Sequence, residues 1–460
     1  MSSMPARIRP VRDSTRILML GILAFLMVLP TLLPRAMATI GTDFINYWSA
    51  GLVLRVAPDT LHNPFVQAEA FRTRLIDHLS TTDSHQVNTV VHEAVTSGHV
   101  PIDYRSTPLA YFVFSWGSSD VGIASQVYRL IQTGMFVLVV LGVARSALGS
   151  WLGALLLAVL LVLGFEPFLA DFRVGNSNVL VLALLAVAFW GLGAFSSFPV
   201  GRAEASPPGT VWRQALGVWL VGATVLLKPT LGPLLGVVVG LVLLGLGWRR
   251  GLAAGALGGV AILGTALLPT WRFGAWTLWG DWLSLIATQG METNADQKAE
   301  MANVAFNPVL AGVLDLPRAV TALGLGLLFL VPMVPVLVNR GRRGLDPGLI
   351  LSLGLFLTIA VTPFMWVHYY TVLILPALVA AQPRYRETAL PILGLLTLVL
   401  SSMTIVSSLR QLLPGVTLGQ GVEHTILMVS WIPLWVGMAR QAVIAARAAG
   451  EGGQAAAQAA

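Results

Sequence analysis

The sequence predicts an all-α integral membrane protein with about twelve transmembrane helices. Of its 460 residues, 56% are hydrophobic and only 11% are charged, whereas a soluble domain carries about 25% charged residues. The mean hydropathy is +0.78. Apolar runs near the length of about 20 residues that a helix needs to cross a bilayer recur along the whole chain. These observations exclude a soluble fold and indicate a multi-pass bundle.

The first apolar run covers residues 17–39 and follows a segment, 1–16, that contains four arginines. This run is longer than the apolar region of a typical secretory signal peptide, so we expect a retained helix rather than a cleaved leader. Arginines before a span favour a cytoplasmic N-terminus.

The remaining spans follow in order. They are expected at 122–144, 150–169, 177–196, 213–231, 233–248, 251–269, 319–338, 347–364, 368–382, 388–407 and 424–442. Every short loop on the N-terminal side then carries arginine, at Arg145, Arg202, Arg213, Arg249, Arg250, Arg340, Arg342, Arg343, Arg384, Arg386, Arg440 and Arg447. This distribution agrees with the positive-inside tendency and supports the orientation.

Two long segments, 40–121 and 270–318, are then expected on the outer side. Residues 17–442 form one transmembrane domain, with a flexible cytoplasmic linker at 197–212. The Ala/Gly/Gln-rich residues 443–460 are expected to be a disordered cytoplasmic tail. Long ordered loops usually carry function, so the outer segments are where a site is sought first.

The chain contains no cysteine, which excludes disulfides, thiolate metal sites and thiol nucleophiles. Its formal net charge of +7 comes almost entirely from arginine, because Lys228 and Lys298 are its only lysines. The arginines lie between apolar spans, where they set topology, so we expect no nucleic-acid partner.

Four histidines lie seven residues apart, at positions 78, 85, 92 and 99. On one helix this spacing separates neighbours by about 10 Å, too far to share a metal ion. A surface helix over 84–97 would also divide the series between elements. We therefore expect no metal site here.

Asp43 lies just beyond the outer end of the first predicted span. Asn46 and Tyr47 follow at i+3 and i+4, so the three side chains share one helix face. A carboxylate beside the bilayer suits proton transfer from a hydroxyl group. The alternative is an acid at a helix N-terminus that is favoured only by the helix dipole.

Tyr104 and Arg105 come shortly before the second predicted span. Arginine forms bidentate contacts with phosphate oxygens, and the tyrosine is a candidate for contact with a sugar. Both residue types also prefer the depth of the lipid headgroups, so interfacial anchoring is the alternative.

The predicted turn between the third and fourth spans, 166–178, holds two acids, an arginine and the run Gly-Asn-Ser-Asn. Polar groups at the mouth of a bundle are costly unless they pair or line a wet cavity. Asn176 and Asn178 are therefore candidate substrate ligands. Helix capping is the alternative for Asn178, which begins the next span.

Lys228 is the only lysine associated with a span, and Pro229 beside it should break the helix. A compact ammonium is suited to a lipid phosphate, whereas the alternative is a side chain that only reaches to the membrane edge. His368 and Tyr369, at the outer boundary of two spans, are candidates for phosphate or sugar contact or for an aromatic belt.

Three tryptophans, Trp276, Trp279 and Trp282, repeat at intervals of three and predict one aromatic helix stripe. Such a helix should lie in the membrane interface, where its simplest role is anchoring.

Taken together, these motifs resemble glycosyltransferase family 87, a bacterial group that includes polyprenol-phosphate-mannose-dependent mannosyltransferases. The resemblance covers most of the chain in the same order, and its motifs are Gly41-Thr-Asp43-Phe-Ile-Asn-Tyr47, Tyr104 to Pro108, Gly175-Asn176-Ser-Asn178, Lys228-Pro229 and His368-Tyr369. The chain departs from the family pattern in having Asn176 where glutamine is expected. The family's polar Asn-x-Ser element is only approximated by Asn303 to Asn307.

The resemblance implies a GT-C-type bundle in the bacterial inner membrane, with its active site facing the periplasm. It implies a donor sugar, mannose first, linked to polyprenyl phosphate, and a lipid or glycan acceptor. Asp43 would be the general base of an inverting reaction, and Lys228, Arg105 and His368 would stabilise the leaving phosphate. Such a donor has one phosphate and no nucleotide, so no cofactor or metal is expected.

The remaining residues expected to bind substrate are Asn46, Tyr47, Tyr104, Asn176, Asn178 and Tyr369.

Two other functions stay open at this point. A flippase or transporter of lipid-linked oligosaccharides predicts broken helices and charges near mid-membrane. An O-antigen ligase or polymerase would use an undecaprenyl-diphosphate donor and should show more arginines in its large outer loop. The sequence leaves the sugar, the acceptor, the linkage and the oligomeric state undetermined.

Overall fold

A computed structural model of the chain describes residues 10–38, 40–81, 86–98, 102, 104–195, 210–245, 248–289, 304–334, 346–402 and 420–458. Every regular element within these ranges is a helix, and none of these residues lies in a β-strand. The prediction of an all-α protein is therefore confirmed.

The first half of the chain holds α1 (Pro10–Ala38), α2 (Thr42–Val56), α3 (Ala68–Thr81), α4 (Gln86–Thr96), α5 (Pro108–Phe114), α6 (Val121–Leu148), α7 (Trp151–Gly164), α8 (Glu166–Val174), α9 (Asn178–Gly191), α10 (Thr210–Leu227) and the 3₁₀ helix η1 (Pro229–Leu231). The second half holds α11 (Gly232–Gly245), α12 (Trp248–Phe273), α13 (Leu278–Gln289), α15 (Phe306–Leu314), α16 (Arg318–Leu330), η2 (Val331–Met333), α18 (Pro347–Val361), η3 (Val367–Leu373), α19 (Ile374–Ala380), η4 (Pro383–Tyr385), α20 (Leu390–Leu400), α22 (Gln420–Val429) and α23 (Ile432–Gln458).

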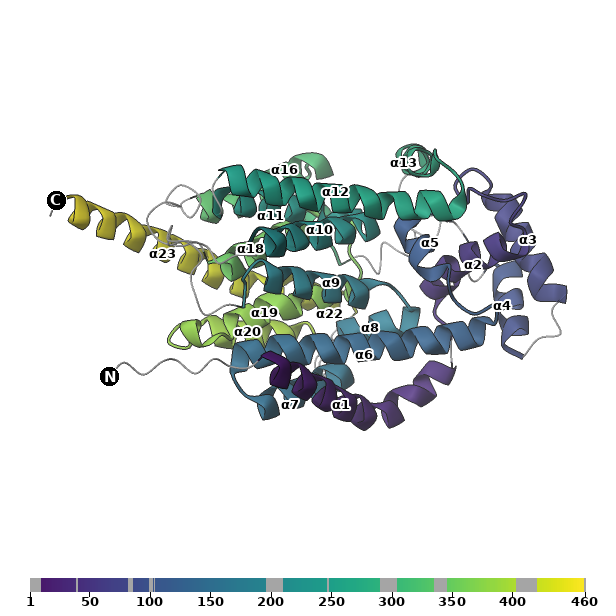
Figure 1. Ribbon diagram of the computed structural model, residues 1–460, viewed down its shortest axis with the longest axis horizontal. Coiled ribbons are helices and arrows are strands. Elements are labelled where there is room, and N and C mark those ends of the chain that lie inside the picture. The colour runs from purple at the N-terminus through teal and green to yellow at the C-terminus, as the bar shows by residue number, and fades with distance from the viewer. Residues whose placement is uncertain are drawn as a thin grey trace.

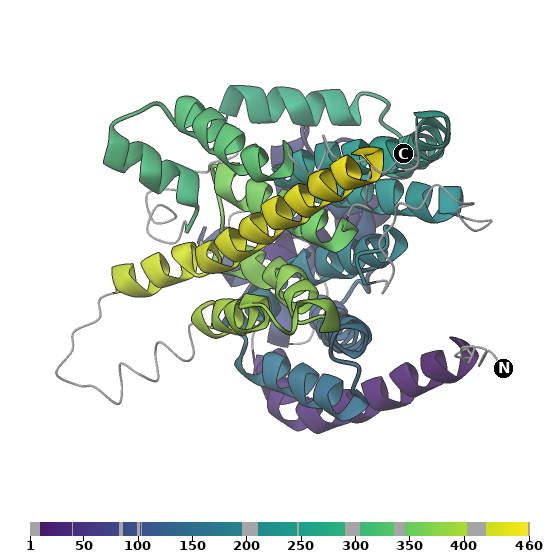
Figure 2. The same ribbon diagram turned by 90° about the vertical axis from the view of Figure 1, so that its left-hand side faces the viewer.

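The long helices lie side by side as a bundle, and the short helices α2, α3, α4 and α5 gather at one end of it with α13 (Figure 1). The start of α1 and the end of α23 lie toward the other end. Viewed from that side, α23 crosses the end of the bundle (Figure 2). The segment predicted to lie outside the membrane therefore contains helices of its own, at the end of the bundle away from the chain termini.

Three helical segments in the described residues are long and apolar enough to cross a membrane: Val121–Leu148, Trp248–Phe273 and Thr425–Ala445. Two bent helix pairs, α7 with α8 and α15 with α16, raise this number to five if each pair forms one span. Seven further apolar helices have 10–17 residues. The structure thus supports an α-helical membrane protein without confirming the expected count of about twelve spans.

Prolines explain two of the breaks that shorten these helices. The axes of α7 and α8 differ by 56°, and Pro167 lies in the first turn of α8. Proline lacks an N–H for the preceding turn, so it favours the start of a new helix. Most of the predicted turn 166–178 is consequently the helix α8. Pro229 ends α10 at Leu227 in the same way, as the sequence predicted.

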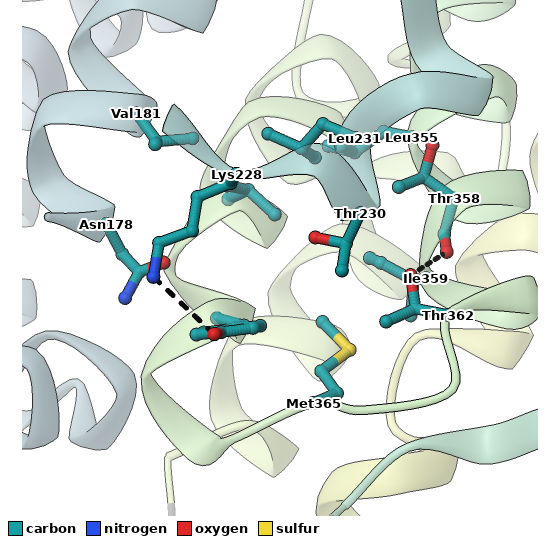
Figure 3. Close-up of a pocket in the computed structure, with 12 residues that line it drawn as sticks. Asn178, Val181, Lys228, Thr230, Leu231, Leu355, Thr358, Ile359, Thr362 and Met365 are labelled. Carbon is teal, nitrogen blue, oxygen red and sulfur yellow. Dashed lines mark hydrogen bonds between the residues drawn. The ribbon is translucent and has the colours of Figure 1, made fainter. Parts of the chain in front are cut away.

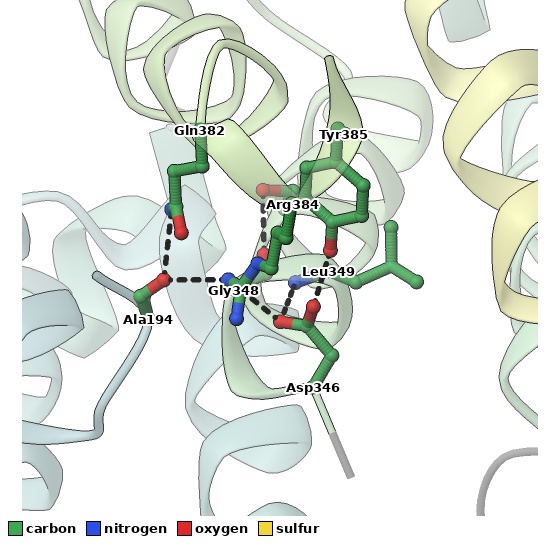
Figure 4. A network of polar contacts seen from close by, with 8 residues as sticks. Ala194, Asp346, Gly348, Leu349, Gln382, Arg384 and Tyr385 are labelled. Carbon is green, nitrogen blue, oxygen red and sulfur yellow. Dashed lines mark hydrogen bonds and ion pairs between the residues drawn. The ribbon is translucent and has the colours of Figure 1, made fainter. Parts of the chain in front are cut away.

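A polar network fastens the far ends of α9 and α18 (Figure 4). Asp346 caps α18 by accepting the Leu349 N–H at 3.2 Å, and it also accepts from Arg384, at 3.1 Å, and from the Tyr385 hydroxyl. Arg384 and Gln382 both donate to the carbonyl of Ala194, which follows α9, at 3.0 and 2.9 Å. This network joins three segments that are distant in sequence.

Candidate functional site

The start of α2 packs directly against the end of α8, and two glycines permit this approach. A Cβ on Gly41 would collide with the carbonyl oxygen of Val174. Gly175 ends α8 with φ +68°, and a Cβ on it would lie 2.7 Å from Cβ of Phe44. Glycine alone combines that backbone conformation with the space required. The glycines of two sequence motifs are therefore explained by contact between those motifs.

This approach brings Asp43 to Asn176. Asp43 lies in the first turn of α2, so the helix dipole also favours its carboxylate. This was the alternative role considered for Asp43 from the sequence. The Asn176 amide nitrogen Nδ2 donates to Asp43 Oδ2 at 2.5 Å. A carboxylate and an amide that are 133 residues apart in sequence thus meet at the end of the bundle.

The other side of the Asn176 amide receives Lys228. Lys228 Nζ donates to Asn176 Oδ1 at 2.9 Å, and the Ser177 N–H donates to the same oxygen at 2.6 Å. These donors at Oδ1 orient the amide so that its nitrogen faces Asp43. Asn176 therefore lies between a carboxylate and an ammonium group. We call this arrangement the Asp43–Asn176–Lys228 bridge.

Lys228 lies at the break between α10 and η1 and is partly buried. Besides Asn176, its ammonium contacts Tyr369, with the hydroxyl 3.5 Å away and the ring centroid 4.6 Å away. Both partners are neutral, and among the described residues Lys228 forms no ion pair. The carboxylates of Asp43 and Asp171 lie near enough to favour its charge, although neither pairs with it directly.

Asp171 and Asn178 support the bridge from behind. Asp171 is fully buried and accepts from Gln132 Nε2 at 2.6 Å, from Asn178 Nδ2 at 2.7 Å and from the Val179 N–H at 3.1 Å. Its carboxylate therefore caps the start of α9, whereas Asn178 does not act as the cap. Asn178 also approaches Asn176 Oδ1, at 3.1 Å. These bonds hold the polar run in one conformation.

Two further residues that hold Asn176 in place were not identified from the sequence. Tyr128 donates its hydroxyl to the Asn176 carbonyl at 2.5 Å, and Gln132 approaches the same oxygen at 3.3 Å. Both lie on α6, four residues apart, and therefore on one helix face. Two polar side chains at this spacing within an apolar span were the signal that would have identified them.

Asn46 and Tyr47 follow Asp43 by three and four residues on α2. Tyr47 is buried, with its ring stacked on Phe114 at a centroid distance of 4.8 Å. Burial raises the pKa of its hydroxyl, so this group stays protonated, and the charges of Lys228 and Asp43 act on it too. Asn46 Oδ1 is buried without a hydrogen-bond partner. Both residues thus present unused polar atoms close to Asp43.

The structure places Tyr104 elsewhere, in an aromatic cluster between α2, α3 and α5. Its ring is fully buried, packs edge-on against Phe71 and Tyr111, and its hydroxyl accepts from Ser49 at 3.4 Å. Arg105 is half-buried, and its carbonyl accepts from Trp282 Nε1 at 3.1 Å. No described contact brings either residue to the Asp43–Asn176–Lys228 bridge.

His368 lies one residue before the tyrosine that contacts Lys228. It is 6% exposed, stacks parallel to Trp366 and meets the Tyr369 ring edge-on at 5.0 Å. Its Nε2 atom is buried and has no hydrogen-bond partner. Tyr369 therefore contacts Lys228 directly, and His368 contacts Tyr369.

A small apolar pocket opens beside Lys228, with an accessible volume of about 30 Å³, enough for about one or two water molecules (Figure 3). It lies between η1, α18 and η3, and Asn178, Lys228 and Tyr369 supply polar atoms at one side. The other lining residues are Val181, Thr230, Leu231, Leu355, Thr358, Ile359, Thr362, Met365 and Val372. The pocket therefore offers a mostly apolar surface next to the lysine ammonium.

Two other sequence predictions concern the histidine series and the tryptophan stripe. The helix expected over 84–97 is α4, and His78 and His92 lie on separate helices, while the histidines at 85 and 99 are outside the described residues. The described part of the chain contains no group of three residues arranged to hold a metal ion. The prediction of one stripe of three tryptophans was wrong, because Trp276 precedes α13 and is exposed, whereas Trp279 and Trp282 lie on α13 and pack inward.

Comparison of the chain with protein-family models, with curated proteins and with solved structures found no match.

Proposed function

We propose that this protein is a GT-C-type membrane glycosyltransferase. It moves a sugar from a polyprenyl-phosphate donor to a hydroxyl group of a lipid or glycan acceptor, with Asp43 as general base. The observation that carries the proposal is the Asp43–Asn176–Lys228 bridge beside an apolar pocket. A proton acceptor, a phosphate-binding cation and a place for a lipid chain are the three features that this reaction requires.

In the proposed reaction, Asp43 takes the proton of the acceptor hydroxyl as its oxygen attacks the anomeric carbon of the donor. The new bond joins the acceptor oxygen to the anomeric carbon, and the bond from that carbon to the phosphate oxygen breaks. The electron pair stays on the phosphate, which leaves as polyprenyl phosphate with Lys228 stabilising its charge. Attack opposite the leaving group inverts the anomeric configuration.

Asn176 would keep the two charges apart. Its amide donates to the Asp43 carboxylate and accepts from the Lys228 ammonium, so the two side chains do not pair directly. An acid paired directly with Lys228 would be a weaker base, because a nearby cation lowers the pKa of a carboxyl group. The bridge thus keeps Asp43 from pairing directly with Lys228, a separation that the two proposed roles require.

The site should face the outer side of a bacterial inner membrane. The arginine distribution supports this orientation, and α2–α5 lie at the end of the bundle opposite the end of α23. Ser97, after α4, and Ser146, near the far end of α6, are both exposed. In intact cells an impermeant thiol reagent should label Ser97→Cys and not Ser146→Cys, since the native chain has no cysteine.

The direct test supplies purified protein in liposomes with one donor at a time and a mixture of envelope lipids as acceptors. Polyprenyl-phosphate mannose is the first donor, followed by other polyprenyl-phosphate sugars. We expect donor consumption and a new glycolipid without nucleotide sugar or ATP. Consumption of an undecaprenyl-diphosphate donor instead would assign the protein to the ligase or polymerase class.

A flippase is the second candidate, because α7/α8 and α15/α16 are broken helix pairs, bent by 56° and 113°. The same liposomes separate the two functions. A flippase moves the labelled lipid between leaflets and leaves the sugar–phosphate bond intact, whereas the transferase breaks that bond.

A further inference from the structure

The outward face of α12 is an apolar stripe that ends at a cluster of arginine and tryptophan. Val260, Leu263, Leu267 and Trp271 are 68%, 66%, 54% and 69% exposed, and their spacing of three or four residues places them on one face. Large apolar side chains exposed over several turns are suited to contact with lipid chains.

The two ends of α12 place this stripe relative to a bilayer. Trp248 lies beside Arg249 at the start of the helix, and Trp271 lies beside Arg272 at its end. Trp271 follows Trp248 by 23 positions, which corresponds to about 34 Å of helix, close to the hydrocarbon thickness of about 30 Å. Tryptophan and arginine at this separation are typical of the two membrane interfaces, so Arg272 lies at headgroup depth.

Arg272 extends over the turn that follows α5. Its guanidinium carbon lies 5.1 Å from the ring centroid of Trp116, a side chain that is 61% exposed. The Nε atom of Arg272 is buried and has no hydrogen-bond partner, and no ion pair of Arg272 occurs among the described residues. A guanidinium has five N–H donors, so this one retains capacity for a ligand.

Arg55 reaches the same turn from the last turn of α2. Its Nη1 donates to the Ser115 carbonyl at 2.7 Å and its Nη2 approaches the Ser118 carbonyl at 3.3 Å. Burial, followed by the positive charge of Arg272, lowers the pKa of Arg55, and no carboxylate in the described chain counters this effect. Arg55 and Arg272 therefore form a cationic pair on either side of residues 115–118.

We propose that Arg55 and Arg272 bind the phosphate of an anionic phospholipid, with Trp116 against the glycerol region and the acyl chains along the α12 stripe. Two guanidinium groups match the oxygens of a phosphodiester, and the apolar stripe begins where the headgroup ends. The site is separate from the Asp43–Asn176–Lys228 bridge and does not depend on sugar transfer. A bound lipid would join α2, the turn after α5, and α12.

The test measures lipid binding and thermal unfolding of the purified full chain in a neutral detergent. The additions are dioleoyl phosphatidylglycerol, dioleoyl phosphatidylcholine and glycerol 3-phosphate. We expect phosphatidylglycerol alone to remain bound in native mass spectrometry and to raise the Tm. Arg272→Gln should weaken its binding about ten- to a hundred-fold, since one charge-assisted contact is lost. Arg272→Lys, which keeps the charge, should recover part of it.

Arg74→Gln is the matched control, because Arg74 is an exposed arginine on α3 at the same end of the molecule. It should bind phosphatidylglycerol like the native chain. Equal binding by Arg272→Gln and the native chain would overturn the proposal. So would an equal effect of phosphatidylcholine, which would show that the headgroup charge is not recognised, or of glycerol 3-phosphate, which would assign the site to a soluble phosphate.

Discussion

Polar clusters lie at both ends of α9 and α18, and the two clusters hold their opposite charges in different ways. At one end Asp346 accepts directly from Arg384 and from Tyr385. At the other end Asp43 and Lys228 are separated by the amide of Asn176. Both clusters join segments distant in the chain, but only the first pairs its opposite charges.

The difference indicates which cluster serves the fold and which serves a reaction. A direct pair neutralises both charges and saturates their hydrogen bonds, which stabilises the ends of the helices it joins. The Asp43–Asn176–Lys228 bridge instead keeps its carboxylate and its ammonium apart, with an amide between them and a pocket beside the lysine. Substitutions at the two ends should therefore separate activity from stability.

The largest effect is expected for Asp43→Asn. The amide is nearly isosteric but does not accept a proton at useful pH, and loss of a general base typically costs about 10²–10⁴-fold in rate. Expression, Tm and donor affinity should stay close to native while sugar transfer falls. Asp43→Glu should also be slow, because an added methylene displaces the carboxylate by about an ångström.

Asp59→Asn is the control for this change, since Asp59 is an exposed acid shortly after α2. It should transfer sugar normally. Near-native transfer by Asp43→Asn, together with loss in Asp171→Asn, would move the base to Asp171 and invert our assignment of the two acids.

Lys228→Ala should give the next largest effect, a loss of about ten- to a hundred-fold in donor use, since one charge-assisted contact to the phosphate disappears. Lys228→Arg should recover only part of the donor use, because a planar guanidinium group replaces a compact ammonium group. Donor dependence of initial rates measures this effect. Native kinetics in folded Lys228→Ala would show that Lys228 does not bind the donor phosphate and only extends toward the membrane edge.

The sequence located both charges of the bridge but not the bridge itself. Asp43 and Lys228 stand out locally, one as an acid after an apolar run and the other as a lysine before proline. Their meeting at Asn176 depends on the packing of α2 against α8, and no local pattern encodes that packing. Tyr104 shows the same limit, because the aromatic contacts that bury it come from α3 and α5. The number of spans was not confirmed, because several apolar helices are shorter than a span and the predicted span 150–169 contains the break before Pro167.

Gly175→Ala should have a smaller effect on both properties. A left-handed conformation costs a non-glycine residue about 1–2 kcal/mol, and the new Cβ would lie 2.7 Å from Cβ of Phe44. We expect a lower Tm and slower transfer, because α2 must move away from Asn176. Gly149→Ala is the control, since Gly149 has a similar φ of +71° but no atom within 4 Å of the added Cβ. It should lower the Tm without slowing transfer by the protein that remains folded.

The smallest effect is expected for Tyr385→Phe at the far end. Burial, and then the charge of Asp346, raises the pKa of the Tyr385 hydroxyl, so this group stays protonated and donates to the carboxylate near neutral pH. Its removal leaves Asp346 paired with Arg384, and the loss should be about 1 kcal/mol, seen as a Tm lower by about 1 °C with unchanged transfer. Tyr369→Phe removes the corresponding hydroxyl beside Lys228 and should give the opposite pattern, with slower transfer and a native Tm. If both variants lost only stability, the two clusters would be equivalent supports of the fold, and the functional assignment of the Asp43–Asn176–Lys228 bridge would fail.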